Sequence, residues 1–245
     1  MPDENHRLPV GAQSAPAHAS SLIGRRALTR HRHQRPPTGP VTHDDRRFDA
    51  WSRSYERSWA QTLFFAPVQR SLVAAVSGQA RPGRVLDIGC GTGRLLDRLG
   101  SSMPGASLAG IDRSAGMLAA ARRMRPNLHL ARGSAEALPY PDGAFDLVTT
   151  TLSFHHWSDK ASALVEIRRV LSPGGLLALA DPATDDLPGW PGVLRAVLRR
   201  DRHMIPLKER HRLLEGAGLR VRKVTRAFHG RWVPLTLAER PAPPI

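Results

Sequence analysis

Hydrophobic residues follow two different spacings along the chain, and the spacing changes near residue 83. Between residues 48 and 78 the apolar residues recur three or four positions apart, beginning with Phe48, Trp51, Tyr55 and Trp59. This spacing places them on one face of a helix, so we expect a helical cover over residues 48–80. Packing on a core is the simpler interpretation of this face, and Tyr55 is also a candidate ligand contact.

After residue 83 short apolar segments alternate with segments of helical spacing. Predicted strands cover residues 84–88, 107–111, 128–131, 145–150 and 176–180. Helices are predicted over residues 94–99 and 114–124, and a third helix is expected to start with Ser158 as its N-cap and to stop before Pro173. Short buried strands interleaved with helices indicate a parallel sheet that is covered on both faces.

The last fifty residues have a different pattern. A helix is predicted over residues 206–215, followed by alternating segments at 220–228 and 231–238 with His229 and Gly230 between them. This is the pattern of a hairpin, which places an antiparallel strand at the sheet edge. The predicted fold is therefore α/β and Rossmann-like: a doubly wound, mostly parallel seven-stranded sheet with an antiparallel C-terminal edge hairpin.

Composition divides the chain further. Residues 1–42 are rich in Pro, Ser, Ala, His and Arg without apolar periodicity, so we expect a disordered basic tail before a domain at 43–245. The formal net charge of +15 is distributed as +4, +2 and +9 over residues 1–47, 48–194 and 195–245. An acidic partner would explain this excess, but an arginine-rich composition with a solvated surface is the favoured interpretation.

A single cysteine, Cys90, excludes an internal disulfide and a multi-cysteine zinc site, and no bound metal is predicted. No apolar run approaches the roughly 20 residues that a membrane span needs, so no membrane span is predicted. We therefore expect a cytoplasmic protein.

A glycine-rich segment at residues 85–93 leaves the first predicted strand and enters a helix. Its glycines, Gly89, Gly91 and Gly93, allow a tight turn and the close approach of a ligand to the backbone. Asp112 ends the second predicted strand 19 residues after Gly93. A carboxylate at that distance can accept hydrogen bonds from both ribose hydroxyls of a nucleoside, and its simpler role would be a helix N-cap.

The charge beside this turn bears on the kind of nucleoside. A dinucleotide normally uses a G-x-G-x-x-G spacing, whereas these glycines run G-x-G-x-G and follow the acidic Asp87. A carboxylate there disfavours an anionic pyrophosphate and suits a ligand that carries ammonium and sulfonium groups. This argument favours S-adenosylmethionine over NAD.

Five ordered motifs now carry a family resemblance. They lie at residues 85–93, 110–114, 133–142, 145–148 and 169–175, and residues 48–55 add the entry to an N-terminal helix. Residues 45–182 thus resemble the class I S-adenosylmethionine-dependent methyltransferases, in particular the ubiquinone/menaquinone-biosynthesis C-methyltransferase-like group with its methyltransferase type 11 domain.

The resemblance implies a cofactor-binding core at residues 84–182 that binds S-adenosyl-L-methionine. It assigns the methionine portion to the turn, the ribose to Asp112 and the adenine border to residues 134–136, where Ser134 replaces the Asp that is frequent in the family. The backbone of Thr151 would flank the sulfonium, and Cys90 is interpreted as a small packing residue. The candidate cofactor-binding residues are Tyr55, Asp87, Gly89, Cys90, Gly91, Gly93, Asp112, Arg113, Ser134, Ala135, Glu136 and Thr151.

The expected partner is a small-molecule methyl acceptor, with O-, N- and C-methylation all open. His155 and His156 follow the fourth predicted strand, where a histidine can take a proton during methyl transfer, although both also fit a structural role. Residues 185–205, which include Trp190, are expected to form part of an acceptor lid.

Three other functions compete with this interpretation. The positive charge suggests a nucleic-acid methyltransferase, but the strand-four motif of base-amino methylation is replaced by residues 149–152, Thr-Thr-Thr-Leu, and no cysteine lies outside the glycine turn. A non-catalytic S-adenosylmethionine-binding protein is opposed by the intact acidic and glycine positions. An NAD-dependent oxidoreductase is opposed by the glycine spacing.

Overall fold

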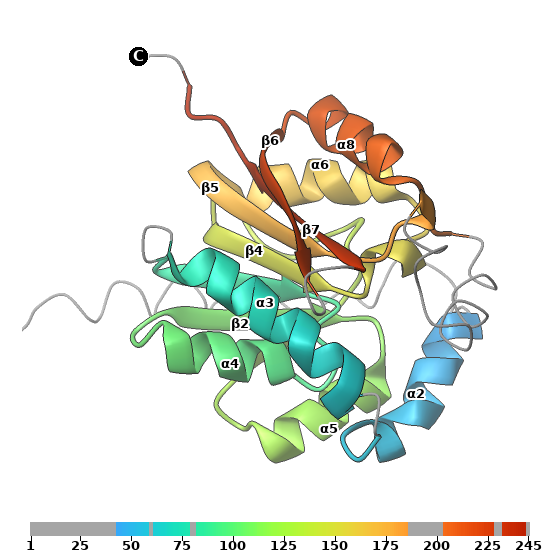
Figure 1. The fold of residues 1–245 in the computed structure, drawn as a ribbon. Coiled ribbons are helices and arrows are strands. Elements are labelled where there is room, and N and C mark those ends of the chain that lie inside the picture. Colours follow the sequence, from blue (N-terminus) through green and yellow to red (C-terminus); the bar gives the residue numbers. More distant parts are fainter. Residues whose placement is uncertain (1–42, 59–60, 79–81, 186–202, 228–231, 244–245) are drawn as a thin grey trace, which may run out of the picture. The chain divides into compact units, whose positions relative to one another are not determined.

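The computed structural model describes residues 43–58, 61–78, 82–185, 203–227 and 232–243 (Figure 1). One sheet has the strand order β3-β2-β1-β4-β5-β7-β6. Its strands are β1 (Arg84–Ile88), β2 (Ser107–Asp112), β3 (His129–Arg132), β4 (Phe145–Thr151), β5 (Leu171–Ala180), β6 (Arg220–Ala227) and β7 (Val233–Glu239). Strands β1 to β5 pair in parallel, and β7 pairs antiparallel with both β5 and β6. The predicted mixed seven-stranded sheet is confirmed.

Strand β5 begins five residues earlier than predicted, at Leu171 instead of Leu176. Leu171 pairs with Phe145 of β4, and the register then shifts before Leu147 pairs with Leu176. The glycines between them also exchange backbone hydrogen bonds with Arg240 after β7. A glycine-rich stretch that reads as a helix stop in the sequence therefore joins the sheet through irregular pairing.

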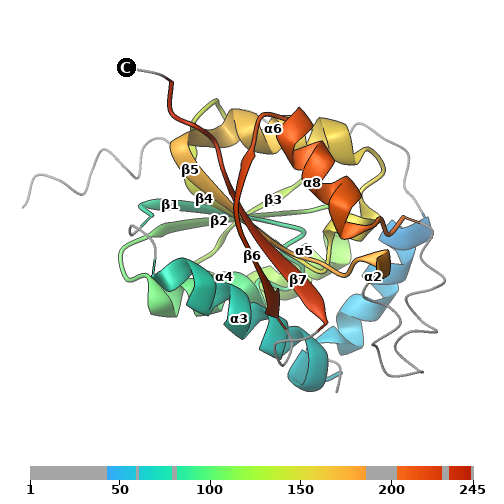
Figure 2. The ribbon, with the colours of Figure 1, turned by 45° about the horizontal axis from the view of Figure 1, so that its top comes forward.

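Helices cover both faces of the sheet, as predicted. Figures 1 and 2 show α3 (Ala66–Ser77), α4 (Arg94–Ser102) and α5 (Ala115–Met124) on one face and α6 (Lys160–Val170) and α8 (Leu207–Gly216) on the other. The apolar side chains of α3 and α4 pack on the sheet in a continuous core that includes Leu72, Leu99 and Leu147. Burial on both faces explains why β1 and β4 consist almost entirely of buried residues.

The N-terminal cover is interrupted. It consists of α2 (His43–Tyr55), a short π-helix η1 (Gln61–Phe65) and α3, and α2 packs against α5. Trp59, which the helical spacing places on the same face as Tyr55, lies outside the described residues. The expected tail at residues 1–42 and most of the expected lid at 185–205 lie outside them as well.

The predicted cap of the third helix is wrong by one residue. Helix α6 starts at Lys160, and its N-cap is Asp159, whose side chain accepts a hydrogen bond from the backbone N–H of Ser162. The backbone N–H of Ser158 instead donates to Glu136, 3.1 Å away. Both residue types are good caps, so the spacing of apolar residues alone did not distinguish them.

The described helices and side chains show neither a membrane span nor a metal cluster. No helix within the ranges given above has the length and apolar character that a bilayer span requires. In the same part of the chain, no group of three or more His, Cys, Asp or Glu side chains is placed to hold a metal ion.

Candidate functional site

The strand order reverses between β1 and β4, because β1 has β2 on one side and β4 on the other. In open α/β sheets this reversal leaves a crevice at the carboxyl ends of the strands, where ligands bind. A cavity lies at this edge, with about 910 Å³ of empty space that includes its open mouth. It is lined by residues that follow β1, β2 and β4, by α2 and by the short 3₁₀ helix η2 (Phe154–His156). This position makes it the candidate ligand site.

The glycine turn forms the floor beside β1. Gly89, Gly91 and Gly93 have φ angles of 69°, 52° and 82°, which lie in the left-handed region that glycine adopts without strain. A Cβ atom on Gly89 would also overlap the side chain of Ser153 after β4. The Gly89 N–H donates to the carbonyl of Ile111 at 2.9 Å, which joins the turn to the end of β2. Glycine is therefore required at 89 by conformation and by space.

Asp112 connects the turn to the next helix. One oxygen of its carboxylate accepts the backbone N–H of Gly91 at 2.8 Å, and the other accepts that of Ser114 at 2.8 Å. Ser114 itself is the N-cap of α5, because its hydroxyl accepts the N–H of Met117. The N-cap of α5 is therefore Ser114 and not Asp112, whose carboxylate instead joins the glycine turn to the start of the helix and lines the cavity.

The sequence-predicted site residues fall into two groups. Nine line the cavity: Tyr55, Gly89, Gly91, Asp112, Arg113, Ala135, Glu136, Thr151 and His156. Five lie outside its lining: Asp87, Cys90, Gly93, Ser134 and His155. All five residues of the second group are buried. They would therefore affect a ligand in the cavity through the residues that line it.

Asp87 is the clearest case of a buried member. Its carboxyl is 2% exposed and accepts a hydrogen bond from the Thr149 hydroxyl at 2.9 Å. Burial raises the pKa of Asp87 to about 8, although the bond from Thr149 acts in the opposite direction. Around neutral pH this group therefore holds a proton in most ligand-free molecules.

Glu136 lines the cavity and already has partners. Its Oε1 atom accepts the backbone N–H groups of Ser158 and Asp159 at 3.1 and 3.4 Å. These bonds connect the segment after β3 to the residues that precede α6. The carboxylate therefore helps to position the cavity wall.

A row of aromatic rings forms the opposite wall. Trp51 packs edge-to-face on Tyr55 with ring centroids 4.6 Å apart, and Tyr55 packs on Phe65 of η1 at 5.6 Å. At the other end Phe48 contacts Trp51 at 6.2 Å and His156 at 5.1 Å. All five side chains line the cavity. The helix expected as a cover, with Tyr55 as its one candidate ligand contact, thus supplies much of the site.

The adjacent histidines occupy different environments. His155 is 6% exposed, and its Nδ1 atom lies 2.9 Å from Oδ1 of Asp181, a buried residue immediately after β5. Its backbone N–H donates to the other oxygen of Asp181 at 3.1 Å. The His156 ring contacts that of His155, with centroids 4.0 Å apart and planes tilted by 43°, and it lines the cavity. Only His156 is therefore placed to meet a molecule in the cavity.

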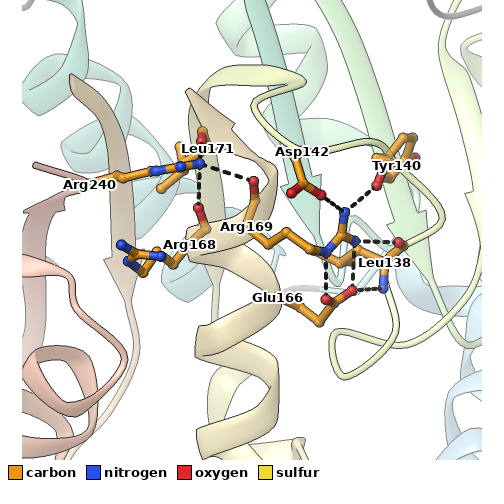
Figure 3. Close-up of polar contacts among 8 residues, drawn as sticks. All are labelled: Leu138, Tyr140, Asp142, Glu166, Arg168, Arg169, Leu171 and Arg240. Atoms are coloured by element: carbon orange, nitrogen blue, oxygen red, sulfur yellow. Dashed lines mark hydrogen bonds and ion pairs between the residues drawn. The ribbon is translucent and has the colours of Figure 1, made fainter. Parts of the chain in front are cut away.

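Arg169, near the end of α6, fixes the segment that continues from Glu136 (Figure 3). Its guanidinium donates to the carbonyls of Leu138 and Tyr140 at 3.0 and 2.7 Å and to the carboxylate of Asp142 at 2.9 Å. It also forms a bidentate pair with Glu166, which in turn accepts the Leu138 N–H at 2.8 Å. This network ties residues 138–142 to α6, and their neighbours Ala135 and Glu136 line the cavity.

Several lining residues were not identified from the sequence. They include Leu152, which has a φ of 54° that is rare for a non-glycine residue, and Ser153 and Trp157 on the same connection. Asp181, which pairs with His155, was also missed. Its position directly after the fifth predicted strand was the available signal, because that end of the strand faces the ligand edge.

Comparison with known proteins identifies the core. Residues 86–179 match the family described as "Methyltransferase domain". Demethylmenaquinone methyltransferase from Thermus thermophilus is 42% identical over 104 residues, which are 41% of this chain and 47% of that protein. Malonyl-[acyl-carrier protein] O-methyltransferase from Geobacter sulfurreducens is 36% identical over 138 residues, 52% of this chain and 51% of that protein. The chain spans about half the length of these curated relatives.

A solved structure shows the same fold over a larger part of the chain. The S-adenosylmethionine-dependent methyltransferase from Aquifex aeolicus superposes with a TM-score of 0.63 and 20% sequence identity. The superposition covers 81% of this chain and 99% of that one. The Rossmann-like methyltransferase fold is therefore confirmed, including elements outside the matched core.

Replacement of Arg169 should destabilise the domain. Lysine cannot reach two carbonyls and two carboxylates at once, so Arg169→Lys leaves buried acceptors without donors and should cost about 2 kcal/mol. Urea unfolding checks this value. Arg168→Lys is the matched control on the same helix and should change the stability by less than about 0.5 kcal/mol. Equal effects of the two variants would contradict the role given to Arg169.

Asp87 should make the stability of the ligand-free protein depend on pH. Its folded-state pKa is about 8, above the ordinary value of 3.8. The folded protein binds more protons than the unfolded chain between these values, so the free energy of unfolding should fall as pH rises from about 4 to about 8. Urea unfolding at several pH values measures this slope. Asp87→Asn should reduce it, and an unchanged slope would contradict a raised pKa.

Proposed function

We propose that this chain is a class I, S-adenosylmethionine-dependent methyltransferase that transfers a methyl group from S-adenosylmethionine to a small-molecule acceptor, since residues 86–179 match a methyltransferase domain. The observation that carries this proposal is the cavity at the strand reversal, where a glycine turn and the Asp112 carboxylate face an aromatic wall. The relatives named above act on different acceptors by name, so the methylated atom is left open as O, N or C.

The residues of the cavity fit the proposed donor. Asp112 offers carboxylate oxygens for ribose hydroxyls, and Ile111, Met117 and Ala135 provide apolar contacts for a flat base. The turn at Gly89 and Gly91 brings the backbone to the cavity without side chains. These features match a nucleoside with a short positively charged tail, and we assign the methionine portion to the turn.

Asp87 supports the same donor indirectly. Its carboxyl lies beneath the turn and has a pKa of about 8, so a nearby ammonium or sulfonium would favour its ionised form. Binding of such a ligand would release a proton from Asp87 near neutral pH. An anionic pyrophosphate would favour the protonated form instead.

His156 is the proposed general base, which removes a proton from the substrate that accepts the methyl group. S-adenosylmethionine, when bound, supplies an electrophilic methyl group on a positively charged sulfur. The acceptor atom would use its electron pair to form the bond to the methyl carbon as the bond from carbon to sulfur breaks, with S-adenosylhomocysteine as the second product. His156, which lines the cavity, would take the proton that the acceptor loses. His155 is assigned a positioning role, since its ring contacts that of His156 and is oriented by Asp181.

The cytoplasm is the proposed location, since the single cysteine gives no sign of an oxidising compartment. Nucleic acid is not proposed as the substrate. The aromatic wall encloses the cavity beside the donor, and this suits a small acceptor. Binding of RNA with a steep salt dependence would favour a nucleic-acid substrate instead.

Calorimetric titration with S-adenosylhomocysteine and NAD tests the donor assignment. We expect S-adenosylhomocysteine to bind and NAD to give no heat. Asp112→Ala should weaken S-adenosylhomocysteine binding roughly 100-fold, because hydrogen bonds to a charged group are lost. Arg168→Lys serves as the control with unchanged affinity. Absence of S-adenosylhomocysteine binding to the unmodified protein would overturn the proposed function.

Metabolite profiling of a deletion strain, which should accumulate a species lighter by one methyl group, would supply the acceptor for kinetics. With this acceptor as the substrate, His156→Gln should lower kcat about 100-fold or more. It should also remove the pH dependence of kcat that ionisation of the base causes. The affinity for S-adenosylhomocysteine should stay within about twofold. An unchanged kcat would show that His156 is not the base.

A further inference from the structure

Helix α2, which carries the aromatic wall, is attached to the start of α5 by Asp49. One oxygen of the Asp49 carboxylate accepts the hydroxyl of Ser114 at 2.5 Å and the backbone N–H of Gly116 at 2.9 Å. Gly116 lies in the first turn of α5, where backbone N–H groups have no partner within the helix. A carboxylate from α2 therefore satisfies a donor of another helix and interacts favourably with its dipole.

The fit between α2 and α5 leaves no room for a side chain at 116. A Cβ atom on Gly116 would lie 3.1 Å from both the Cα and the carbonyl oxygen of Asp49 and 2.8 Å from the Ser52 hydroxyl. Two of these contacts are with backbone atoms, which cannot move without moving the helix. The close approach of α2 to α5 thus depends on glycine at this position.

A second carboxylate, Glu56, holds the other end of α2. It immediately follows the helix and accepts the Thr92 hydroxyl at 2.5 Å and the Nε–H of Arg94 at 2.7 Å. Arg125 also donates to it at 3.2 Å and contacts the Thr92 carbonyl at 2.9 Å. Thr92 belongs to the glycine turn, so this cluster joins α2 to the opposite side of the cavity.

Trp51 and Tyr55 lie between these two attachments and Phe48 directly precedes the first, and all three line the cavity. We propose that Asp49 and Glu56 are positioning residues that hold α2 across the donor site and thereby slow the dissociation of bound S-adenosylmethionine and S-adenosylhomocysteine. The inference rests on the proposed function, because it takes these ligands as the occupants of the cavity.

Release of tritium-labelled S-adenosylhomocysteine into excess unlabelled ligand measures the dissociation rate directly. Asp49→Ala and Glu56→Ala should each accelerate release about tenfold, since each removes bonds to a charged group. Asp49→Asn retains an acceptor oxygen and should restore most of the slow release. Release at the rate of the unmodified protein in both alanine variants would overturn the inference.

Gly116→Ala tests the same contact without removing any polar group. Alanine favours a helix more than glycine does, so a purely local effect would keep or raise the thermal midpoint. The added Cβ should instead displace α2 and accelerate release about tenfold. Gly216→Ala is the matched control in α8, since a Cβ there meets no atom within 4 Å, and its release rate should equal that of the unmodified protein. Unchanged release in Gly116→Ala would also overturn the inference.

The double variant Asp49→Ala/Gly116→Ala tests whether the two substitutions act on the same contact between α2 and α5 or on two independent ones. If both changes loosen the same attachment, the double variant should release ligand about as fast as either single variant. Multiplied effects would contradict a shared contact. The proposed function is tested separately, because absence of S-adenosylhomocysteine binding to the unmodified protein would overturn it whatever the release rates of the variants.

Discussion

The position of the site follows from one constraint on parallel strands, namely that their carboxyl ends lie at the same edge of the sheet. Residues 88, 89, 91, 112 and 151–153 are distant in sequence but all lie at or just after the carboxyl end of a strand, and they meet in one cavity. The crevice exists because the strand order reverses between β1 and β4, so no connection crosses that edge. The donor half of the site is therefore a consequence of topology before any side chain is considered.

Carboxylates around the cavity share a second physical role. Asp49, Asp112 and Glu136 each accept backbone N–H groups in segments where a turn or a helix begins. Such donors gather at the carboxyl edge of an α/β sheet, because each strand there leads towards a helix whose first N–H groups lack partners. Acidic side chains satisfy them and interact favourably with the helix dipoles. The acidic side chains at this edge thus help to maintain the walls of the cavity.

The elements that could be predicted were those with a strong local signal. The buried strands were recognised by their apolar runs, and the bounds of β1 were predicted to the residue. The glycine turn and Asp112 were recognised by residue type and by their spacing along the chain. Asp49 and Glu56 have no such signal, because a polar residue on an amphipathic helix normally faces solvent and their partners lie 36 to 69 residues away. The separate environments of His155 and His156 also depend on a distant residue, Asp181, which no local pattern connects to them.

Through the aromatic row, α2 contacts both ends of the cavity wall. Phe48 touches His156, and Tyr55 touches Phe65 at the other end of the row, so the position of α2 affects both the donor wall and the proposed base. His156 also contacts the ring of His155, which Asp181 holds from the core. The proposed base therefore has His155 on one side and Phe48 of α2 on the other. Displacement of α2 would thus change the surroundings of the proposed base as well as the wall of the cavity.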